Sequence, residues 1–335
     1  MKPKAVFMSN EEAINNAYSE TVRRKMNNLL DFVPGYYTGE SFRHPSGVSD
    51  LKDVEYVFST WGMPSLTEAE IRSFLPKLKA VFYAAGSVQS FARPFLNLGI
   101  RVFSAWTANA VPVAEFTVSE ILLATKGYYH RLHKGGCPSG GILSDCSFPG
   151  NFGAPVGIIG AGAVGSLVIE MLKNHNLDIY VYDPFMSDQK AAALKITKTD
   201  SLHDLFKNCF VISNHLANNP QTENIIDGKC FALMGKNAVF INTGRGMQVN
   251  EEDLISAMKA EPSRIALLDV TRTEPPEQGS ELYALPNIFL TPHIAGSIGC
   301  EVQRMGEYML EEFEKTISGK ETKYGVTLKM LETMA

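Results

Sequence analysis

The chain has 335 residues, 45% hydrophobic and 20% charged, which is an ordinary globular balance, and at about 150 residues per domain this length predicts two domains. The net charge of −5 argues against nucleic-acid binding, because such proteins usually carry an excess of lysine and arginine that displaces phosphate counterions. No stretch approaches 18 uninterrupted apolar residues, and the N-terminal residues lack the apolar core of a signal peptide, so we expect a cytoplasmic protein without a membrane partner.

The first third of the chain alternates short apolar runs with helical patterns. A helix is expected over 11–30, with Ser9 or Asn10 as its cap, and another from the capping-box pattern Ser65-Leu66-Thr67-Glu68 to about residue 78. The apolar runs that predict strands lie at 5–8, 56–59, 79–84 and 101–104. Strands that alternate with helices indicate crossover connections and a parallel sheet.

A long helical pattern from Val111 to about Leu132 follows, with Pro112 in the first turn, where proline is tolerated. Residues 134–154 are rich in Gly, Pro, Ser and Cys and predict a loop that crosses between domains. A last helix is expected over 297–318. A second block of apolar runs predicts six more strands, at 156–160, 178–182, 209–215, 238–242, 265–270 and 287–291. The predicted fold class is therefore α/β, with two doubly wound parallel-sheet domains.

The five cysteines stand at 137, 146, 209, 230 and 300. Their number is odd and no two are two or three residues apart, which argues against a zinc ribbon, a redox-active pair and a secreted disulfide framework. We expect reduced thiols and no metal site.

A glycine-rich segment at 157–165 carries the first functional signal. Gly160, Gly162 and Gly165 form G-x-G-x-x-G directly after a predicted strand, and the next strand ends in Asp183, 18 residues after the third glycine. In such a unit the glycines allow a tight turn and close backbone approach, and the helix N-terminus attracts a pyrophosphate. Ala163 and Val164 lie between the glycines, and Asp183 can accept hydrogen bonds from ribose hydroxyls, which favours NAD over NADP.

Three chemically reactive side chains follow three predicted strands. Arg245 follows the strand that ends at 242, Glu274 follows the strand at 265–270, and His293 follows the strand at 287–291. Ligands of open parallel sheets bind beyond the carboxyl ends of the strands, so these residues are expected to share one crevice with the glycine loop.

Histidine is the usual proton donor near neutral pH, a neighbouring carboxylate favours the imidazolium, and arginine holds a carboxylate in a two-pronged grip. Each of the three residues taken alone has an ordinary structural explanation. Together, behind a complete nucleotide-binding motif, they predict hydride transfer between a nicotinamide and the carbonyl of a small acid.

The sequence resembles the D-isomer-specific 2-hydroxyacid dehydrogenase family. The matching segments are GIIGAGAVG with YDP, INTGRG, LLDVTRTEPP and LTPHIAG. The resemblance implies that Arg245, Glu274 and His293 are the catalytic set, and that Asp269 contacts the nicotinamide carboxamide. It likewise places Thr243 and His293 beside the cofactor, and it assigns the loop Ala84-Ala85-Gly86-Ser87 to the substrate carboxylate.

The resemblance also implies the architecture. A flavodoxin-like substrate domain would comprise residues 1–110 and 299–335, and a Rossmann NAD-binding domain would comprise 111–298. Family members are commonly homodimers, so we expect a homodimer.

The chain departs from the family pattern around the expected substrate. Ser87-Val88-Gln89 replaces an Asp-Asn or Asp-His pair, Trp106 stands where proline is common, and 213–218 replaces the usual H-x-P-L-T loop. Phosphoglycerate dehydrogenases carry an arginine after the second strand, whereas this chain has Ser59-Thr60-Trp61-Gly62-Met63, without a cation. A non-phosphorylated acid, with Trp61 against its tail, is therefore expected.

Other functions remain open from the sequence alone. Corepressors related to this family bind NAD(H) as sensors while keeping the fold and even the three residues, so a sensor is the principal alternative. Formate dehydrogenases of the superfamily carry glutamine where Glu274 stands, which disfavours that reaction, and phosphite oxidation is a minor possibility.

Overall fold

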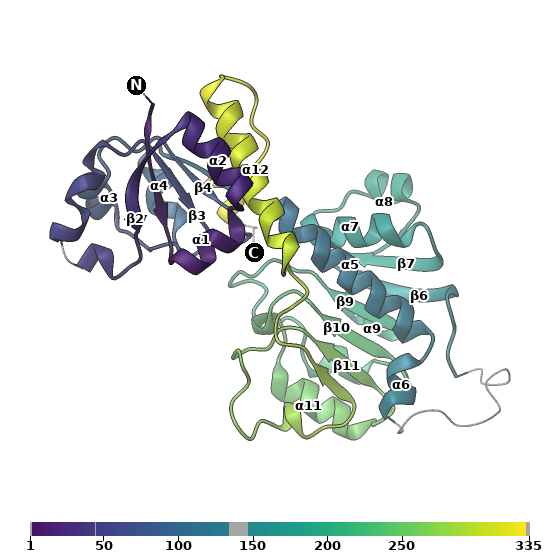
Figure 1. Ribbon diagram of the computed structural model, residues 1–335. Coiled ribbons are helices and arrows are strands. Elements are labelled where there is room, and N and C mark those ends of the chain that lie inside the picture. The colour runs from purple at the N-terminus through teal and green to yellow at the C-terminus, as the bar shows by residue number, and fades with distance from the viewer. Residues whose placement is uncertain (1, 44, 134–146, 333–335) are drawn as a thin grey trace. The chain divides into compact units, whose positions relative to one another are not determined.

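The computed structural model describes residues 2–43, 45–133 and 147–332. The chain forms two compact units (Figure 1): unit 1 comprises residues up to Ala110 together with those from Ser297 onward, and unit 2 comprises Val111–Gly296. Among the helices in the described ranges, none combines the length and apolar character that a membrane crossing requires.

Unit 1 is built on a six-stranded sheet in the order β13-β5-β4-β3-β1-β2. All neighbours pair in parallel except β13, which is antiparallel to β5. The order 2-1-3-4-5 of its parallel strands is that of flavodoxin-like sheets. The strands are β1 (Lys4–Met8), β2 (Asp31–Tyr36), β3 (Tyr56–Ser59), β4 (Ala80–Tyr83), β5 (Arg101–Ser104) and β13 (Gly325–Val326).

Helices cover both faces of this sheet. One face packs on α3 (Glu68–Phe74) and α4 (Ala92–Asn97), and the other on α1 (Glu11–Ala17), α2 (Glu20–Leu29) and α12 (Cys300–Ile317). Figure 1 shows α12, in yellow, beside α1 and α2, although some 270 residues separate them in sequence. Phe313 of α12 lies edge-on to Phe58 and Phe82, so this core needs side chains from both ends of the chain.

Three local expectations for unit 1 are wrong. The single helix over 11–30 is two helices, because Tyr18 turns inward, donates from its hydroxyl to the carbonyls of Ser59 and Phe82, and leaves Ser19 to cap α2. Asn10 caps α1. The capping box uses Thr67 and Glu70 rather than Ser65 and Glu68, which shortens α3. Strand β2 was not expected, since it contains Pro34, which an edge strand tolerates.

Unit 2 contains a seven-stranded parallel sheet in the order β12-β11-β10-β9-β6-β7-β8. Numbered from β6, its first six strands follow the Rossmann order 3-2-1-4-5-6, with β12 added beyond β11. The strands are β6 (Phe152–Ile159), β7 (Asn176–Tyr182), β8 (Thr197–Thr199), β9 (Val211–Asn214), β10 (Val239–Asn242), β11 (Ile265–Leu268) and β12 (Ile288–Leu290). The two sheets confirm the predicted α/β fold class; β8 is an additional, short edge strand.

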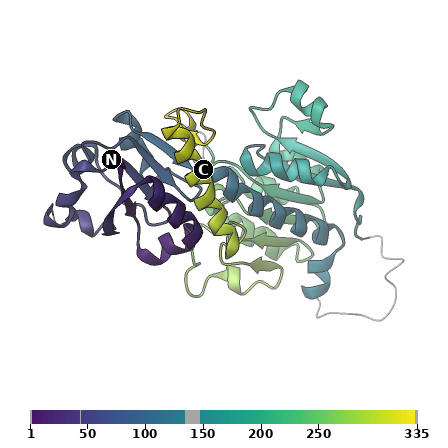
Figure 2. The same cartoon turned by 45° about the horizontal axis from the view of Figure 1, so that its top comes forward.

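Helices also cover both faces of the sheet in unit 2 (Figures 1 and 2). Helices α5 (Trp106–Thr125) and α7 (Ala163–Leu172) pack on one face, and α9 (Leu202–Asn208), α10 (Gly228–Ala232) and α11 (Glu251–Ala260) pack on the other. The shorter α6 (Tyr128–His133) and α8 (Asp188–Leu194) complete the unit. Each face of the sheet therefore packs against its own cluster of buried apolar side chains, and these two clusters support the strands from both sides.

Helix α5 differs from its expectation in a way that has a physical cause. It begins at Trp106 rather than at 111, so Pro112 stands inside the helix instead of in its first turn. Proline has no N–H for the carbonyl four residues earlier, which here belongs to Ala108. The guanidinium of Arg304, on α12, donates to that carbonyl at 3.4 Å. The expected crossing loop at 134–154 lies largely outside the described residues, as do Cys137 and Cys146.

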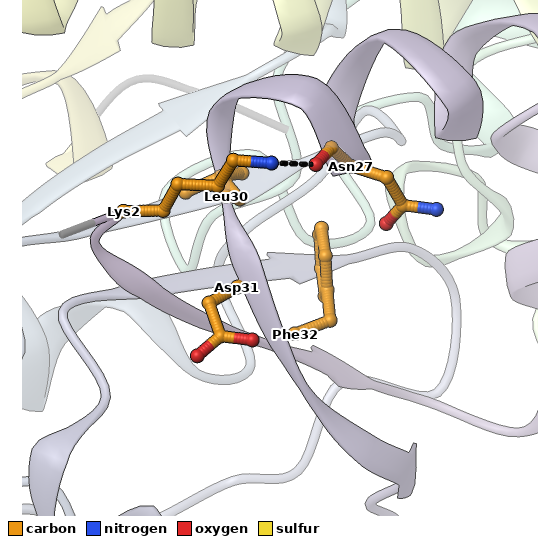
Figure 3. A pocket seen from close by; sticks show the side chains of 5 residues that line it. All are labelled: Lys2, Asn27, Leu30, Asp31 and Phe32. Atoms are coloured by element: carbon orange, nitrogen blue, oxygen red, sulfur yellow. Dashed lines mark hydrogen bonds between the residues drawn. The ribbon is translucent and has the colours of Figure 1, made fainter.

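The surface of unit 1 has a recess of about 490 Å³ along β2, lined by Lys2, Asn27, Leu30, Asp31 and Phe32 (Figure 3). The Lys2 ammonium donates to the Asn27 carbonyl at 2.7 Å, and Asp31 points away from that bond. The ring of Phe32 stacks on Phe7. This recess shares no residue with the candidate site described below.

Candidate active site

The glycine loop lies at the carboxyl end of β6, where the strand order of unit 2 reverses between β6 and β9. Gly160 has a φ of +85°, which favours glycine. A Cβ at Gly165 would lie 1.9 Å from the carbonyl oxygen of Gly160, so only glycine allows the helix to start this close to the strand. Gly162 and Ala163 are exposed at the start of α7, and no side chain caps that helix. Their free N–H groups suit a pyrophosphate.

Asp183 follows β7, and its carboxylate is held toward the glycine loop. One oxygen accepts from the Ala161 N–H at 2.6 Å, and the other accepts from the Phe185 N–H at 2.8 Å. A carboxylate fixed by two backbone donors keeps further lone pairs for the hydroxyls of a ribose, and it repels a phosphate placed there.

His215 packs against the glycine loop. A Cβ added at Gly160 would lie 2.9 Å from the backbone carbonyl oxygen of His215. A Cβ added at Gly165 would lie 3.6 Å from the Cβ of His215. The imidazole is buried, which lowers its pKa to about 3, and its Nε2 lies 3.0 Å from the Ser213 hydroxyl. Its Nδ1 is buried with no hydrogen-bond partner in the described part of the chain. An uncapped helix start, a crowded glycine turn and an unpaired buried polar atom together fit a bound dinucleotide.

Arg245, Glu274 and His293 all follow neighbouring strands, β10, β11 and β12, at the same edge of this sheet. The Nδ1 of His293 lies 2.7 Å from a carboxylate oxygen of Glu274, and both side chains are partly exposed. A histidine held through Nδ1 presents Nε2 outward, the geometry of an oriented acid or base. His293 itself has a φ of +54°, which is uncommon outside glycine.

Arg245 lies in the turn after β10, and its backbone packs against the neighbouring loop. A Cβ on the next residue, Gly246, would lie 2.0 Å from the carbonyl carbon of Thr271, so the two loops touch backbone to backbone. The guanidinium donates to the Gly244 carbonyl at 2.7 Å. Its burial lowers the Arg245 pKa, while the nearby Glu274 carboxylate opposes that shift. A partly desolvated guanidinium with donors to spare is suited to bind an anionic group.

Asp269 anchors the turn that carries His293. One carboxylate oxygen accepts from the Thr291 hydroxyl at 2.6 Å and from the Ile294 N–H at 2.8 Å, and the other accepts from the Ala295 N–H at 2.9 Å. Its backbone carbonyl accepts from the His293 N–H at 3.0 Å. Asp269 is thus committed mainly to this turn, a structural role that the sequence pattern did not reveal.

Helix α5 carries Glu120, whose pKa is influenced by Asp269, and it bonds to Thr243, which follows β10. Burial, and secondarily the negative charge of Asp269, raise the pKa of Glu120 on α5 to about 8. Its Oε2 is buried and has no hydrogen-bond partner among the described residues. Thr243, expected beside the cofactor, bonds through its hydroxyl to the Thr117 hydroxyl of α5 at 2.9 Å. The hydrogen bond between Thr117 and Thr243 ties α5 to the turn that follows β10.

The residues expected to bind the substrate from unit 1 follow β3 and β4. Ala85 is buried, Gly86 and Ser87 are half-buried, and the Ser104 hydroxyl is 2.9 Å from the Ala85 carbonyl and 2.6 Å from the Gly86 carbonyl. The Ser104 hydroxyl therefore holds the carbonyl side of this turn. Trp61 is 44% exposed, and its carbonyl accepts from the Ser9 hydroxyl.

One cluster in unit 2 brings together side chains that can bind metals: donor atoms of His203, Asp227 and Cys230 lie within 4.8 Å of one another. Asp227 already accepts from the N–H groups of Lys229 and Cys230 as the cap of α10. Burial raises the pKa of the Cys230 thiol to about 11, which favours the protonated form. The cluster is therefore explained by helix capping.

Comparisons with known proteins agree with this geometry. Residues 137–295 match the family model described as "D-isomer specific 2-hydroxyacid dehydrogenase, NAD binding domain". A Bacillus subtilis (strain 168) protein that carries the 2-hydroxyacid dehydrogenase name YoaD is 31% identical over 305 residues, covering 88% of this chain and 87% of its own. The chain belongs to the D-isomer-specific 2-hydroxyacid dehydrogenase family. Its cofactor is NAD, as the match to the NAD-binding domain shows.

Other relatives of this dehydrogenase family bear different names. A D-3-phosphoglycerate dehydrogenase of Methanocaldococcus jannaschii is 30% identical over 247 residues; the match covers 73% of this chain but only 46% of that enzyme. Among solved structures, D-mandelate dehydrogenase of Rhodotorula graminis has a TM-score of 0.80 at 19% identity, covering 97% of this chain and 98% of its own. A 2-hydroxyacid dehydrogenase of Lactobacillus delbrueckii ssp. bulgaricus in its NAD-complexed form has a TM-score of 0.75 at 19% identity, covering 97% and 100%. The structural matches show a shared fold.

Proposed function

We propose that this dehydrogenase interconverts a D-2-hydroxy acid and the corresponding 2-oxo acid. The observation that supports this most directly is the 2.7 Å contact between His293 Nδ1 and the Glu274 carboxylate, at the strand edge of the NAD-binding unit. The reduced cofactor, NADH, would supply the hydride to C2 of the 2-oxo acid, and the oxidised cofactor, NAD⁺, would accept it from C2 of the 2-hydroxy acid. His293 would give the proton to the substrate oxygen from Nε2 during reduction and take it back during oxidation.

In this proposal Glu274 holds the imidazole ring and stabilises its protonated form. Arg245 binds the carboxylate and polarises the neighbouring carbonyl, because a planar guanidinium can donate two parallel hydrogen bonds. Ala85, Gly86 and Ser87 would donate backbone N–H groups to the same carboxylate. Gly160, Gly162, Ala163, Val164, Gly165, Asp183, Thr243 and Asp269 would surround the cofactor, and a homodimer is the proposed assembly.

The substrate is proposed to lack a phosphate group. The turn after β3 contains no cation, and a phosphate dianion requires charge-assisted donors. Three cations of unit 1 are the alternative ligands for a phosphate. Arg43 is paired with Glu40 at 2.7 Å, Arg93 lies on α4, and His44 lies outside the described residues. The exposed ring of Trp61 suits the uncharged tail of hydroxypyruvate, glyoxylate or a larger 2-oxo acid.

This proposal is tested by measuring the rate at which the enzyme oxidises NADH with each member of a panel of 2-oxo acids. Turnover with hydroxypyruvate or glyoxylate at a higher kcat/KM than with 3-phosphohydroxypyruvate is expected. A preference for the phosphorylated acid would refute the assigned tail specificity and would direct attention to Arg43, His44 and Arg93. Tight NADH binding with no turnover of any acid would instead favour the sensor function.

A further inference from the structure

Three fully buried amide side chains lie beneath Arg245. Asn214 ends β9, Asn242 ends β10, and Gln248 lies three residues beyond Arg245; their exposed fractions are 0%, 1% and 0%. Buried amides are costly unless their donors and acceptors are paired, so such a group requires an explanation. The residues of the proposed reaction do not account for it.

Asn214 bonds directly to the other two amides. The Asn214 Nδ2 donates both to Asn242 Oδ1 at 3.0 Å and to Gln248 Oε1 at 2.6 Å. The packing around them is tight at residue 244: a Cβ there would lie 3.0 Å from Gln248 Oε1 and 3.1 Å from Asn214 Nδ2, so both amides would have to shift. These three residues are termed the amide cluster.

The amide cluster holds the backbone of Arg245 from both sides. The Arg245 N–H donates to Gln248 Oε1, and the Arg245 carbonyl accepts from Asn242 Nδ2, each at 3.2 Å. The Gly244 N–H donates to Asn242 Oδ1 at 3.1 Å. Both peptide groups of Arg245 are therefore fixed by side chains that do not face solvent.

The same cluster reaches the segment that packs against the glycine loop. Gln248 Nε2 donates to the Leu216 carbonyl at 2.7 Å, and the Leu216 N–H donates to Asn214 Oδ1 at 3.2 Å. Leu216 directly follows His215, whose carbonyl crowds Gly160. One hydrogen-bonded unit thus connects the turn of Arg245 to the segment beside the glycine loop.

We propose that Asn214 and Gln248 are positioning residues that set the Arg245 turn at a fixed place relative to the glycine loop. This inference rests on the proposed function, because it takes Arg245 as the group that binds the carboxylate. A guanidinium displaced by even 1 Å would no longer hold that carboxylate beside the hydride path. The amide cluster would therefore govern binding of the acid rather than binding of NADH.

The test compares four variants. Gln248→Met removes the hydrogen bonds to Arg245 and Leu216 while keeping the side-chain length. The double variant Asn214→Leu/Gln248→Met replaces both members of the bonded pair with apolar side chains of similar size, so that neither amide is left facing a lost partner. It also frees the Leu216 N–H, so the unfolding midpoint decides which of the two cluster variants is carried into the kinetic comparison. Arg245→Met tests the proposed role of the guanidinium directly.

Asn287→Leu is the matched control. Asn287 is 2% exposed and its Nδ2 donates to the Met258 and Arg264 carbonyls, so its loss also removes a buried amide from unit 2. It precedes β12, at the opposite end of the parallel strands from Arg245. Its loss therefore reports destabilisation without disturbance of the Arg245 turn.

The measurements are KM and kcat for hydroxypyruvate, NADH affinity by fluorescence, oxamate affinity in the presence of NADH, and the unfolding midpoint. We expect both cluster variants to raise KM for hydroxypyruvate and the dissociation constant of oxamate at least tenfold, with NADH affinity changed less than about threefold. Asn287→Leu should lower the unfolding midpoint comparably and leave both acid constants within about twofold.

The outcomes separate the inference from the function on which it rests. If Arg245→Met leaves oxamate affinity unchanged, the proposed role of Arg245 is wrong and the inference fails with it. If Arg245→Met weakens oxamate binding but the cluster variants behave like Asn287→Leu, the inference alone is overturned. A loss confined to NADH affinity in the cluster variants would also overturn it.

Discussion

The imidazole of His293 and the carboxylate of Glu274 lie 2.7 Å apart, although 19 residues separate them in the sequence. Asp269 holds the turn that carries the histidine through three hydrogen bonds to its carboxylate. The ring is therefore oriented from one side by Glu274 while its backbone is fixed by a second acid.

Replacing His293 by alanine is expected to lower kcat by roughly 10²–10⁴-fold, the usual contribution of a positioned acid or base. NADH binding should change little, because the glycine loop and Asp183 are untouched. Steady-state kinetics and a fluorescence titration with NADH check this expectation. Turnover within fivefold of the wild type would remove His293 from the mechanism.

Glu274→Gln keeps the hydrogen bond to His293 but removes the negative charge. The protonated imidazole loses its ionic partner, so kcat for reduction of the 2-oxo acid should fall roughly tenfold, the difference between a charged and a neutral hydrogen-bond partner. Steady-state kinetics with hydroxypyruvate measure this fall, and an NADH titration should show unchanged affinity. An unchanged kcat would mean that the charge of Glu274 contributes nothing to the reaction.

Asp183→Ser should reduce the preference for NAD over NADP. The substitution removes a carboxylate that accepts from Ala161 and Phe185 and that would repel a 2′-phosphate. Efficiency with NADPH relative to NADH should rise at least tenfold, measured as the ratio of kcat/KM for the two cofactors. Equal efficiency with both cofactors in the wild type would contradict the assigned role of Asp183.

Two glycines of the loop offer a matched pair of substitutions. A Cβ at Gly165 would overlap the Gly160 carbonyl oxygen, so Gly165→Ala should lower the unfolding midpoint and weaken NADH binding together. A Cβ at Gly162 has no atom within 4 Å, so Gly162→Ala should leave stability unchanged and weaken NADH binding alone by obstructing the pyrophosphate. Thermal unfolding and NADH titration of both variants distinguish the two effects; equal loss of stability would contradict the geometry.

The raised pKa of Glu120 determines how the free energy of unfolding should depend on pH. Its pKa is raised by burial to about 8, whereas its ordinary value is 4.5, so between these values the folded state keeps a proton that the unfolded state has released. The free energy of unfolding should therefore fall as pH rises from about 4.5 to 8 through this group. Glu120→Gln should remove that fall and stabilise the protein by about 4 kcal/mol at pH 8, against about 1 kcal/mol at pH 5, because each pKa unit corresponds to about 1.4 kcal/mol. Urea unfolding at both pH values provides the measurement.

Much of the site could be predicted from the sequence because strand ends and glycine spacing are local signals. The G-x-G-x-x-G motif lies after β6, and the residues after β10, β11 and β12 lie at one edge of the sheet, as the pattern of apolar runs indicates. The fold class followed from the same alternation of strands and helices.

Features that depend on long-range contacts could not be predicted. Asn214 and Gln248 become a pair only when β9 and β10 lie side by side, and nothing in their spacing of 34 residues indicates it. The inward turn of Tyr18 uses the carbonyls of Ser59 and Phe82, and the Ala108 carbonyl that Pro112 leaves without an N–H accepts from Arg304 of α12. In each case a distant partner overrides a local preference.

The placement of α12 in unit 1 has a consequence for the order in which the protein folds during synthesis. Unit 2 is one continuous stretch of chain, so all of its contacts are available once residue 296 has left the ribosome. Unit 1 must wait, because Phe313 completes its aromatic core and the buried carboxylate of Glu312 accepts from the N–H groups of Lys323 and Tyr324 just before β13. The sheet made first by the ribosome is therefore the last to be completed, and chaperone protection should be most needed for residues 2–110.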